Sequence, residues 1–349
     1  MKMRFLGKTG LQVSELCLGT GTFGGLGTYK KSGEVSQTEA DLIVAMALDS
    51  DINFFNTAEI YSDGLAETIL GKALGTKRKD AIIISKVHPT RNQGANSGGH
   101  SRKHIIEACE ASLKRLGTDY IDLYELHGFD KDTSLEITLR ALDDLVQQGK
   151  VRYFGCSNYT GWQLMKGLSI SDKNHVERFM TLEAMYSLMS REIELELVPL
   201  CLDQGIAILA FSPLYGGYLS GKYRRDQPWP TGTRFSFQEN SQPWPIELEN
   251  LYRIIDELDR IGKENNVTIA QAALNYLLRK PGVSSLIFAV KTPQQLEENL
   301  KATNWEMISQ DVILLDKLSE PKRKYPYFVH DPVKASKIRE NHDMQVIWK

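Results

Sequence analysis

Short apolar runs alternate with segments of helical periodicity along most of the chain, and this alternation limits the possible folds more than any other feature. The runs are rich in Ile, Val, Leu, Phe and Tyr, and a helix-like segment follows each of them. Such alternation is typical of parallel β-α-β units. We count eight units, which predicts an α/β (β/α)8 TIM barrel, a fold that holds 349 residues in one domain. The expected strands are 16–19, 53–56, 81–86, 120–127, 151–156, 178–183, 207–212 and 285–289.

Helices are expected between these strands, because apolar residues recur there with a spacing of about 3.6 residues. Gly117, Gly149 and Gly205 lie just beyond three of these segments, where helices commonly stop. Examples of the expected helices are 38–50, 102–116, 135–148 and 193–204.

The segments outside the eight units predict a cap, two long loops and a tail. Residues 4–6 and 12–14 flank two glycines, which predicts a β-hairpin that caps the bottom of the barrel. Segments 21–34 and 214–245 are too long for simple connections, and long loops in compact domains usually bind or cover a ligand. We therefore expect one barrel domain over 1–320, with long loops at its C-terminal face, and a C-terminal extension over 321–349.

The charge balance favours a small-molecule partner, and the cysteine pattern favours a protein of a reducing compartment. The net charge is −2 without long basic runs, which argues against a nucleic-acid or membrane surface as the partner. The four cysteines lie far apart and form no C-x-x-C pair, and the His100/His104 spacing lies in a Gly-rich helix start, so neither a disulfide framework nor a metal site is expected. No apolar leader and no stretch of about 18 apolar residues is present, so a cytoplasmic protein is expected.

Five motifs lie at the C-terminal ends of expected strands, where barrel enzymes keep their reactive groups. Together and in this order they closely resemble the aldo-keto reductases, in the branch that includes the potassium-channel β subunits and related bacterial oxidoreductases. The segment SRKHIIEACEASLKRLG resembles that branch as well, and the resemblance covers roughly residues 3–305. The motifs are NFFNTAEIYSDGLAE (53–67), IISKVH (83–88), YIDLYELHGFD (120–130), VRYFGCSNYTGWQL (151–164) and SPLYGGYLSGKY (212–223).

The resemblance implies that Tyr61 is the general acid, that Lys86 lowers its pKa, and that His127 orients and polarises the substrate carbonyl. A carbonyl that receives hydride develops alkoxide charge. A tyrosine hydroxyl, with an ordinary pKa near 10, needs a nearby cation to donate its proton efficiently at neutral pH. His127 can give that developing charge a second hydrogen bond.

Asn56 is the main departure in the catalytic set, because the family pattern has an aspartate there that pairs with the lysine. Asn56 can accept a hydrogen bond from Lys86 but brings no charge, so we expect burial to lower the pKa of Lys86. Two outcomes follow. A neutral Lys86 makes Tyr61 a poor acid, whereas a charged Lys86 makes Tyr61 more acidic and suited to act as the base in alcohol oxidation.

For a nicotinamide cofactor, the resemblance implies that Ser157 and Asn158 hold the carboxamide and that Tyr186 stacks on the ring. Glu183 stands where glutamine is common, so the carboxamide loses one hydrogen bond and the negative charge favours the oxidised cofactor. The remaining residues expected at the cofactor, among them those of the pyrophosphate clamp, are Gly19, Thr20, Ser212, Leu214, Gly217, Ser220 and Lys222.

The adenosine end is expected at FAVKTPQQLEENL, where Thr292, Gln295 and Asn299 match the family pattern. Ala289 replaces a usual glycine, and Lys291 replaces a usual arginine. Lys291 can still pair with a 2′-phosphate as a point charge, although it lacks the fork of arginine. NADP is therefore expected, with NAD as the alternative.

The resulting hypothesis is an NAD(P)-dependent oxidoreductase that interconverts a carbonyl and an alcohol, including sugar-like substrates. Trp229, Phe235, Phe237 and Trp244 either anchor the second long loop or stack on such a substrate. The rival hypothesis is a cofactor-binding redox sensor or regulatory subunit with little turnover because of Asn56. A homo-oligomer is compatible with either.

Overall fold

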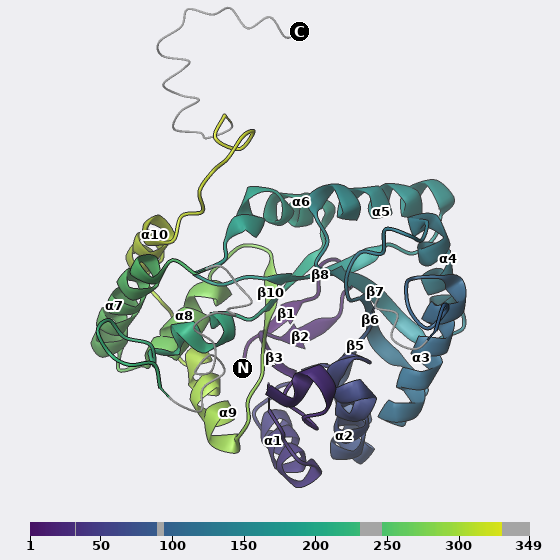
Figure 1. The fold of residues 1–349 in the computed structure, drawn as a ribbon, viewed down its shortest axis with the longest axis horizontal. Helices are drawn as coiled ribbons and strands as arrows, with labels where there is room; N and C mark the ends of the chain where they lie inside the picture. The colour runs from purple at the N-terminus through teal and green to yellow at the C-terminus, as the bar shows by residue number, and fades with distance from the viewer. Residues whose placement is uncertain (32, 89–93, 231–245, 330–349) are drawn as a thin grey trace, which may run out of the picture.

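The computed structural model describes residues 1–31, 33–88, 94–230 and 246–329, and these form a closed barrel of eight parallel strands inside a ring of helices (Figure 1). The strand order around the barrel is β10-β3-β4-β5-β6-β7-β8-β9, so successive strands are neighbours, as the repeated β-α units predict. The predicted fold is therefore confirmed. The strands are β3 (Leu16–Gly19), β4 (Phe54–Asn56), β5 (Ile82–Val87), β6 (Ile121–Leu126), β7 (Val151–Ser157), β8 (Phe179–Met185), β9 (Ala207–Phe211) and β10 (Val283–Phe288).

Helices cover the outside of the barrel (Figure 1). Several of them begin or end at residue types that favour helix ends. Helix α1 begins after Ser36, which forms a capping box with Glu39, and helix α3 ends at Gly117 in a left-handed conformation. The helices are α1 (Gln37–Asp49), α2 (Leu65–Leu74), α3 (Arg102–Leu116), α4 (Leu135–Gln147), α5 (Gly161–Asn174), α6 (Leu197–Gln204), α7 (Leu248–Asn265), α8 (Ile269–Leu278), α9 (Pro293–Leu300) and α10 (Ser309–Leu318).

The expected helix over 193–204 is wrong in its first third. A 3-10 turn covers Glu192–Leu195, the backbone breaks at Glu196, and α6 starts at Leu197. Pro199 explains the break: it has no backbone N–H and its ring would clash with an earlier turn, so it is tolerated only near the start of a helix.

The hairpin lies at the N-terminal end of the barrel, as predicted, with β1 (Met3–Phe5) paired to β2 (Gln12–Ser14). The apolar residues that point into the barrel pack against the hairpin. The strand residues between them point outward and pack against the helices. This alternation follows from the period of two in a strand. The interior set is Leu6, Val13, Cys17, Phe54, Ile84, Leu123, Ala207, Leu209 and Ile287.

After α10 the chain passes the segment before α6: the Tyr327 hydroxyl donates to Glu196 Oε2 at 3.3 Å, and Arg323 and Tyr327 line a pocket with Arg191. Residues 330–349 lie outside the described part, so the division into a barrel and an extension stays a prediction. Within the described ranges, no helix is long and apolar enough to cross a membrane. The expected loop residues Phe235, Phe237 and Trp244 also lie outside those ranges.

Candidate active site at the C-terminal ends of the strands

Strand ends and one tight turn bring Tyr61, Lys86 and His127 together. Lys86 is the second-last residue of β5 and His127 directly follows β6. Tyr61 starts a turn in which Ser62 has a left-handed φ of 51° and donates a hydrogen bond of 2.6 Å to the carbonyl of Phe23. The long loop after β3 thereby holds the turn that carries Tyr61.

The three groups lie at distances suited to one reaction centre. Lys86 Nζ lies 3.4 Å from the Tyr61 hydroxyl, and the Tyr61 and His127 rings lie 5.8 Å apart edge to face. Tyr29 on one side and His88 on the other extend the row of half-buried rings, at 4.9 Å and 5.2 Å from their neighbours. The Tyr61 ring therefore lies within a row of four aromatic side chains, Tyr29, Tyr61, His127 and His88.

Burial sets the protonation of Tyr61 and His127. Burial raises the pKa of Tyr61 and outweighs the lowering effect of Lys86, so the hydroxyl is a protonated acid at neutral pH. Lys86 does lower the pKa of Tyr61, as expected, although the net shift is upward. Burial, Lys86 and His88 together hold the pKa of His127 well below its ordinary value, so its imidazole is neutral.

The expected lowering of the Lys86 pKa is wrong. Its ammonium donates to Asn56 Oδ1 at 2.7 Å and forms an ion pair with Glu183 Oε2 at 3.3 Å. Burial lowers the pKa of Lys86, but Glu183 and Tyr61 raise it by more, so the net shift is upward. The sequence reasoning failed because it placed Glu183 at the cofactor and did not consider it as the partner of the lysine.

Glu125, Thr181 and Gly155 join this cluster, and the sequence reasoning missed all three. Glu125 is fully buried and adjoins Lys86 in the pairing of β5 with β6. The Thr181 hydroxyl donates to Glu125 Oε1 at 2.6 Å. A side chain at Gly155 would lie 1.9 Å from the Thr181 hydroxyl oxygen, so only glycine leaves room. The inward alternation of β6, which puts Glu125 on the face of Leu123 and His127, was the available signal.

The residues expected at the nicotinamide gather beside this cluster. Asn158 has a left-handed φ of 59°, and its amide donates to the carbonyl of His127 at 3.1 Å and to Ser157 Oγ at 3.0 Å. Its backbone N–H donates to the carbonyl of Glu183 at 3.1 Å. Asn158 therefore links the residue that follows β6 to β8.

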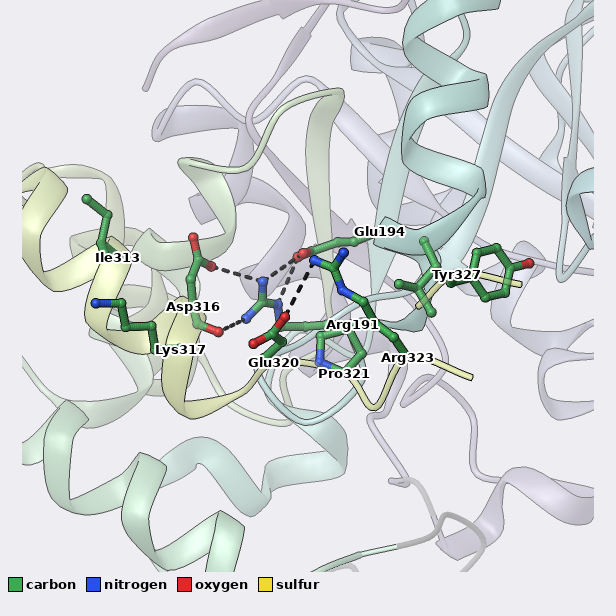
Figure 2. Close-up of a pocket in the computed structure, with 10 residues that line it drawn as sticks. Arg191, Glu194, Ile313, Asp316, Lys317, Glu320, Pro321, Arg323 and Tyr327 are labelled. Carbon is green, nitrogen blue, oxygen red and sulfur yellow. Dashed lines mark hydrogen bonds and ion pairs between the residues drawn. The ribbon is translucent and has the colours of Figure 1, made fainter. Parts of the chain in front are cut away.

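A polar clasp of Arg191, Glu194 and Asp316 lines a pocket of about 600 Å³ (Figure 2). The clasp also holds the hydroxyl end of Tyr186. The Tyr186 hydroxyl donates to Glu194 Oε1 at 2.5 Å. Arg191 binds Glu194 at 2.7 Å and Asp316 of α10 at 3.1 Å. The charges of the clasp thus pair with one another, and we interpret it as the support of the Tyr186 ring.

The expected phosphate segment has the backbone of a ligand cradle. Ser212 has a φ of 51° and Gly217 has a φ of 105°. No atom of the described residues lies within 4 Å of the position that a Cβ on Gly217 would take. Ser220 closes the turn by donating to the Gly217 carbonyl at 2.6 Å, and Lys222 is exposed. Leu214, which precedes the turn, accepts from the Gly217 N–H at 2.9 Å. A backbone that approaches open space suits a phosphate.

The expected adenosine residues form the start of α9. Thr292 caps the helix, and Gln295 accepts from the backbone N–H of Lys291 at 2.8 Å. Lys291 is exposed and Asn299 is half-buried one helical turn further on. The carbonyl oxygen of Glu298 on the same helix accepts from Gln271, and Glu298 and Ser220 line one pocket of about 840 Å³, so α9 and the phosphate segment are neighbours.

These residues fit a nicotinamide dinucleotide. Gly19 ends β3, and the buried hydroxyl of Thr20 has no hydrogen-bond partner among the described residues. The open space at Gly217 and the exposed cations of Lys222 and Lys291 suit the phosphates. Among the described residues, no group of three or more His, Cys, Asp or Glu side chains could hold a metal ion.

The fold is a closed β/α barrel, and at the C-terminal ends of its strands a tyrosine hydroxyl, a lysine ammonium and a histidine imidazole lie close together. The aldo/keto reductase family model matches residues 15–320. The chain belongs to the aldo/keto reductase family, which supports an oxidoreductase that uses a nicotinamide cofactor.

Three relatives illustrate the range of the family. A probable voltage-gated potassium channel subunit beta of Arabidopsis thaliana is 33% identical and covers 94% of this chain and 100% of its own. The uncharacterized oxidoreductase YrpG of Bacillus subtilis is 35% identical, with 92% and 95% covered. The versiconal hemiacetal acetate reductase of Aspergillus parasiticus is 30% identical, with 93% and 99% covered.

Proposed function

We propose that this protein is an NADP-linked oxidoreductase that interconverts a carbonyl and an alcohol, with Tyr61 as the proton donor and acceptor. The observation that carries the proposal is the 3.4 Å approach of Lys86 Nζ to the Tyr61 hydroxyl beside a neutral His127. A nicotinamide cofactor, which Ser157, Asn158 and the 212–222 segment would hold, would supply or accept the hydride at the substrate carbon.

In the reducing direction, Tyr61 gives its hydroxyl proton to the substrate oxygen as negative charge develops there. The Lys86 ammonium stabilises the phenolate that remains, and the phenolate then recovers a proton from solvent. His127 binds the same substrate oxygen as a neutral imidazole. In the oxidising direction, the same groups act in reverse.

The expected holders of the cofactor are Ser157 and Asn158 at the carboxamide, Tyr186 at the ring, and the 212–222 segment at the pyrophosphate. Lys291 favours a 2′-phosphate and hence NADP over NAD. The row of half-buried rings from Tyr29 to His88 suits a flat or sugar-like substrate. Trp229 instead packs on Tyr218 and Tyr223 at 5.8 Å and 5.4 Å, which favours its role as a loop anchor.

The second candidate is a slow redox sensor or regulatory subunit, and the channel-subunit relatives favour it. Its main physical argument was that Asn56 leaves Lys86 without a counter-charge. The ion pair between Lys86 and Glu183 weakens that argument. We therefore rank the enzyme first.

A rapid-mixing experiment separates the two candidates. The protein is loaded with NADPH and mixed with a panel of aldehydes, ketones and keto-sugars, while nicotinamide absorbance is followed. Oxidation within seconds by at least one carbonyl supports the enzyme. If NADPH binds tightly and exchanges with free cofactor but no carbonyl of the panel oxidises it, the result supports the sensor and contradicts the proposal.

A further inference from the structure

Four polar side chains from four strands share the buried interior of the barrel below Tyr61. They are Asn56, Lys86, Glu125 and Glu183, and none is more than 3% exposed. A buried ammonium is costly unless a carboxylate compensates it and its hydrogen bonds are satisfied. Two carboxyl groups are available in this cluster, so the question is which one balances Lys86.

Geometry identifies Glu183 as the counter-ion. Its Oε2 lies 3.3 Å from Lys86 Nζ and 2.6 Å from Asn56 Nδ2. Asn56 Oδ1 in turn lies 2.7 Å from Lys86 Nζ. An amide can accept from the ammonium with its oxygen and donate to the carboxylate with its nitrogen, whereas a carboxylate at position 56 could only accept. Asn56 is therefore matched to a Glu183 that is charged.

Glu125 has the environment of a neutral acid. Its Oε1 accepts from the Thr181 hydroxyl, and its carboxyl group lies close enough to the Glu183 carboxylate to form a hydrogen bond with it when Glu125 is protonated. Burial raises the pKa of Glu125 well above its ordinary value, and the nearby Glu183 raises it further. A protonated Glu125 adds no charge, so the four side chains sum to one ammonium and one carboxylate.

We infer that Glu183 is the positioning residue that keeps Lys86 an ammonium beside Tyr61, with Asn56 as the neutral bridge between them and Glu125 as a neutral neighbour. This inference deepens the proposed function and rests on it for its catalytic meaning. It moves Glu183 from the carboxamide to the proton-transfer machinery. It also means that the charge of Glu183 is balanced and does not by itself favour the oxidised cofactor.

The inference predicts that the carboxylate and the amide can be exchanged between positions 56 and 183 without loss of the Lys86 charge. Glu183→Gln removes the counter-charge. Asn56→Asp combined with Glu183→Gln returns one carboxylate and one amide to the same pair of sites, so the net charge and the chain of hydrogen bonds are restored. Glu125 could lose its proton and substitute for Glu183, so the comparison is made in the Glu125→Gln background.

The test is the titration of Lys86 itself, followed by NMR of the side-chain carbons in protein labelled with 13C-lysine and assigned with Lys86→Met. In Glu125→Gln, Lys86 is expected to stay an ammonium up to about pH 10. In Glu125→Gln/Glu183→Gln, its midpoint is expected to fall by about two pH units or more. Adding Asn56→Asp to that double variant is expected to restore the first behaviour.

Equal Lys86 titrations in Glu125→Gln and Glu125→Gln/Glu183→Gln would overturn the inference. If the double variant does not fold, the triple variant decides: a folded triple variant with a charged Lys86 supports the inference, and a triple variant that also fails contradicts it. This readout needs no turnover. If the Lys86 titrations behave as expected but the protein reduces no carbonyl, only the proposed function is contradicted. If the protein reduces a carbonyl but the Lys86 titration is the same in Glu125→Gln and in Glu125→Gln/Glu183→Gln, only this inference is contradicted.

Discussion

The amide nitrogen of Asn56 lies 2.6 Å from Glu183 Oε2, although their strands β4 and β8 stand opposite each other in the closed order of the barrel. The contact crosses the barrel interior directly beneath Tyr61. It joins two positions that are 127 residues apart in the chain. The charge state of the reaction centre therefore depends on both positions together.

Asn56→Asp alone is expected to destabilise the protein as pH rises. Two carboxyl groups in contact cannot both ionise, so one of them has a raised pKa in the folded state. An acid whose pKa is higher in the folded state than in the unfolded state, where it is near 4, contributes stability to the folded protein at pH values below about 4. That stability is lost as the pH rises through the folded-state pKa. Urea unfolding of the variant and wild type between about pH 5 and pH 8 should show a gap that widens by up to about 1.4 kcal/mol per pH unit.

The exposed Asn265→Asp is the matched control for this series, because it makes the same chemical change at the surface of α7. Its gap to wild type should stay constant over that pH range. Asn56→Asp/Glu183→Gln should lose most of the pH-dependent gap. A constant gap for Asn56→Asp would contradict the contact between the two sites.

The pH profile of carbonyl reduction should be flat from about pH 6 to about pH 9. Reduction needs protonated Tyr61, and its pKa is raised, so activity is lost only as pH rises beyond this range. His127 has a lowered pKa and stays neutral, so it adds no step near pH 6.5. Initial rates with saturating NADPH measure the profile, and a fall with a midpoint near pH 7 would contradict the account.

Gly155→Ala is expected to destabilise the barrel by about 1–3 kcal/mol. The added methyl group would lie 1.9 Å from Thr181 Oγ1 and 3.0 Å from Glu125 Oε1, so the polar cluster must shift. Gly21→Ala is the control, because among the described residues only a Tyr29 ring atom, at 4.0 Å, lies near its Cβ position. Urea unfolding should place the control within about 0.5 kcal/mol of wild type. Equal stabilities of the two variants would argue against a tightly packed cluster.

Sequence reasoning could predict the barrel, because its strands and helices depend on local information. The family resemblance implied the set of Tyr61, Lys86 and His127, and the catalytic role of that set stays a prediction. Each strand is a short apolar run, and Lys86 and His127 stand at the end of one. The break before α6 was missed because periodicity was followed through Pro199.

The partner of Lys86 could not be predicted in the same way. Strand order predicts that β4 and β8 are opposite, but it does not say that two inward side chains will reach across the interior. The usable signal was the pair of departures itself: an amide at 56 and an acid at 183 stand where the family pattern has an acid and an amide. The two were interpreted separately, and so the opposite effect on the lysine was expected.

Lys291→Met is expected to weaken NADPH binding roughly tenfold, about 1.4 kcal/mol, and to leave NADH binding unchanged. The exposed Lys291 at the start of α9 is the cation proposed for the 2′-phosphate. Lys103→Met, at an exposed lysine of α3 that pairs with Glu107, is the control. Fluorescence titrations with both cofactors measure the effect. An equal loss for NADPH and NADH would contradict the role of Lys291 in choosing NADP.

The most direct test of the proposed function is single-turnover oxidation of bound NADPH by a reactive carbonyl in wild type, Tyr61→Phe and Tyr153→Phe. Tyr153 is the control, because its hydroxyl lies at the other end of the barrel, 3.5 Å from the Thr9 carbonyl oxygen. We expect Tyr61→Phe to slow the step by about 10²- to 10⁴-fold with NADPH affinity unchanged, and Tyr153→Phe to react at the wild-type rate. Wild-type rates in Tyr61→Phe would contradict the assignment of Tyr61 as the proton donor.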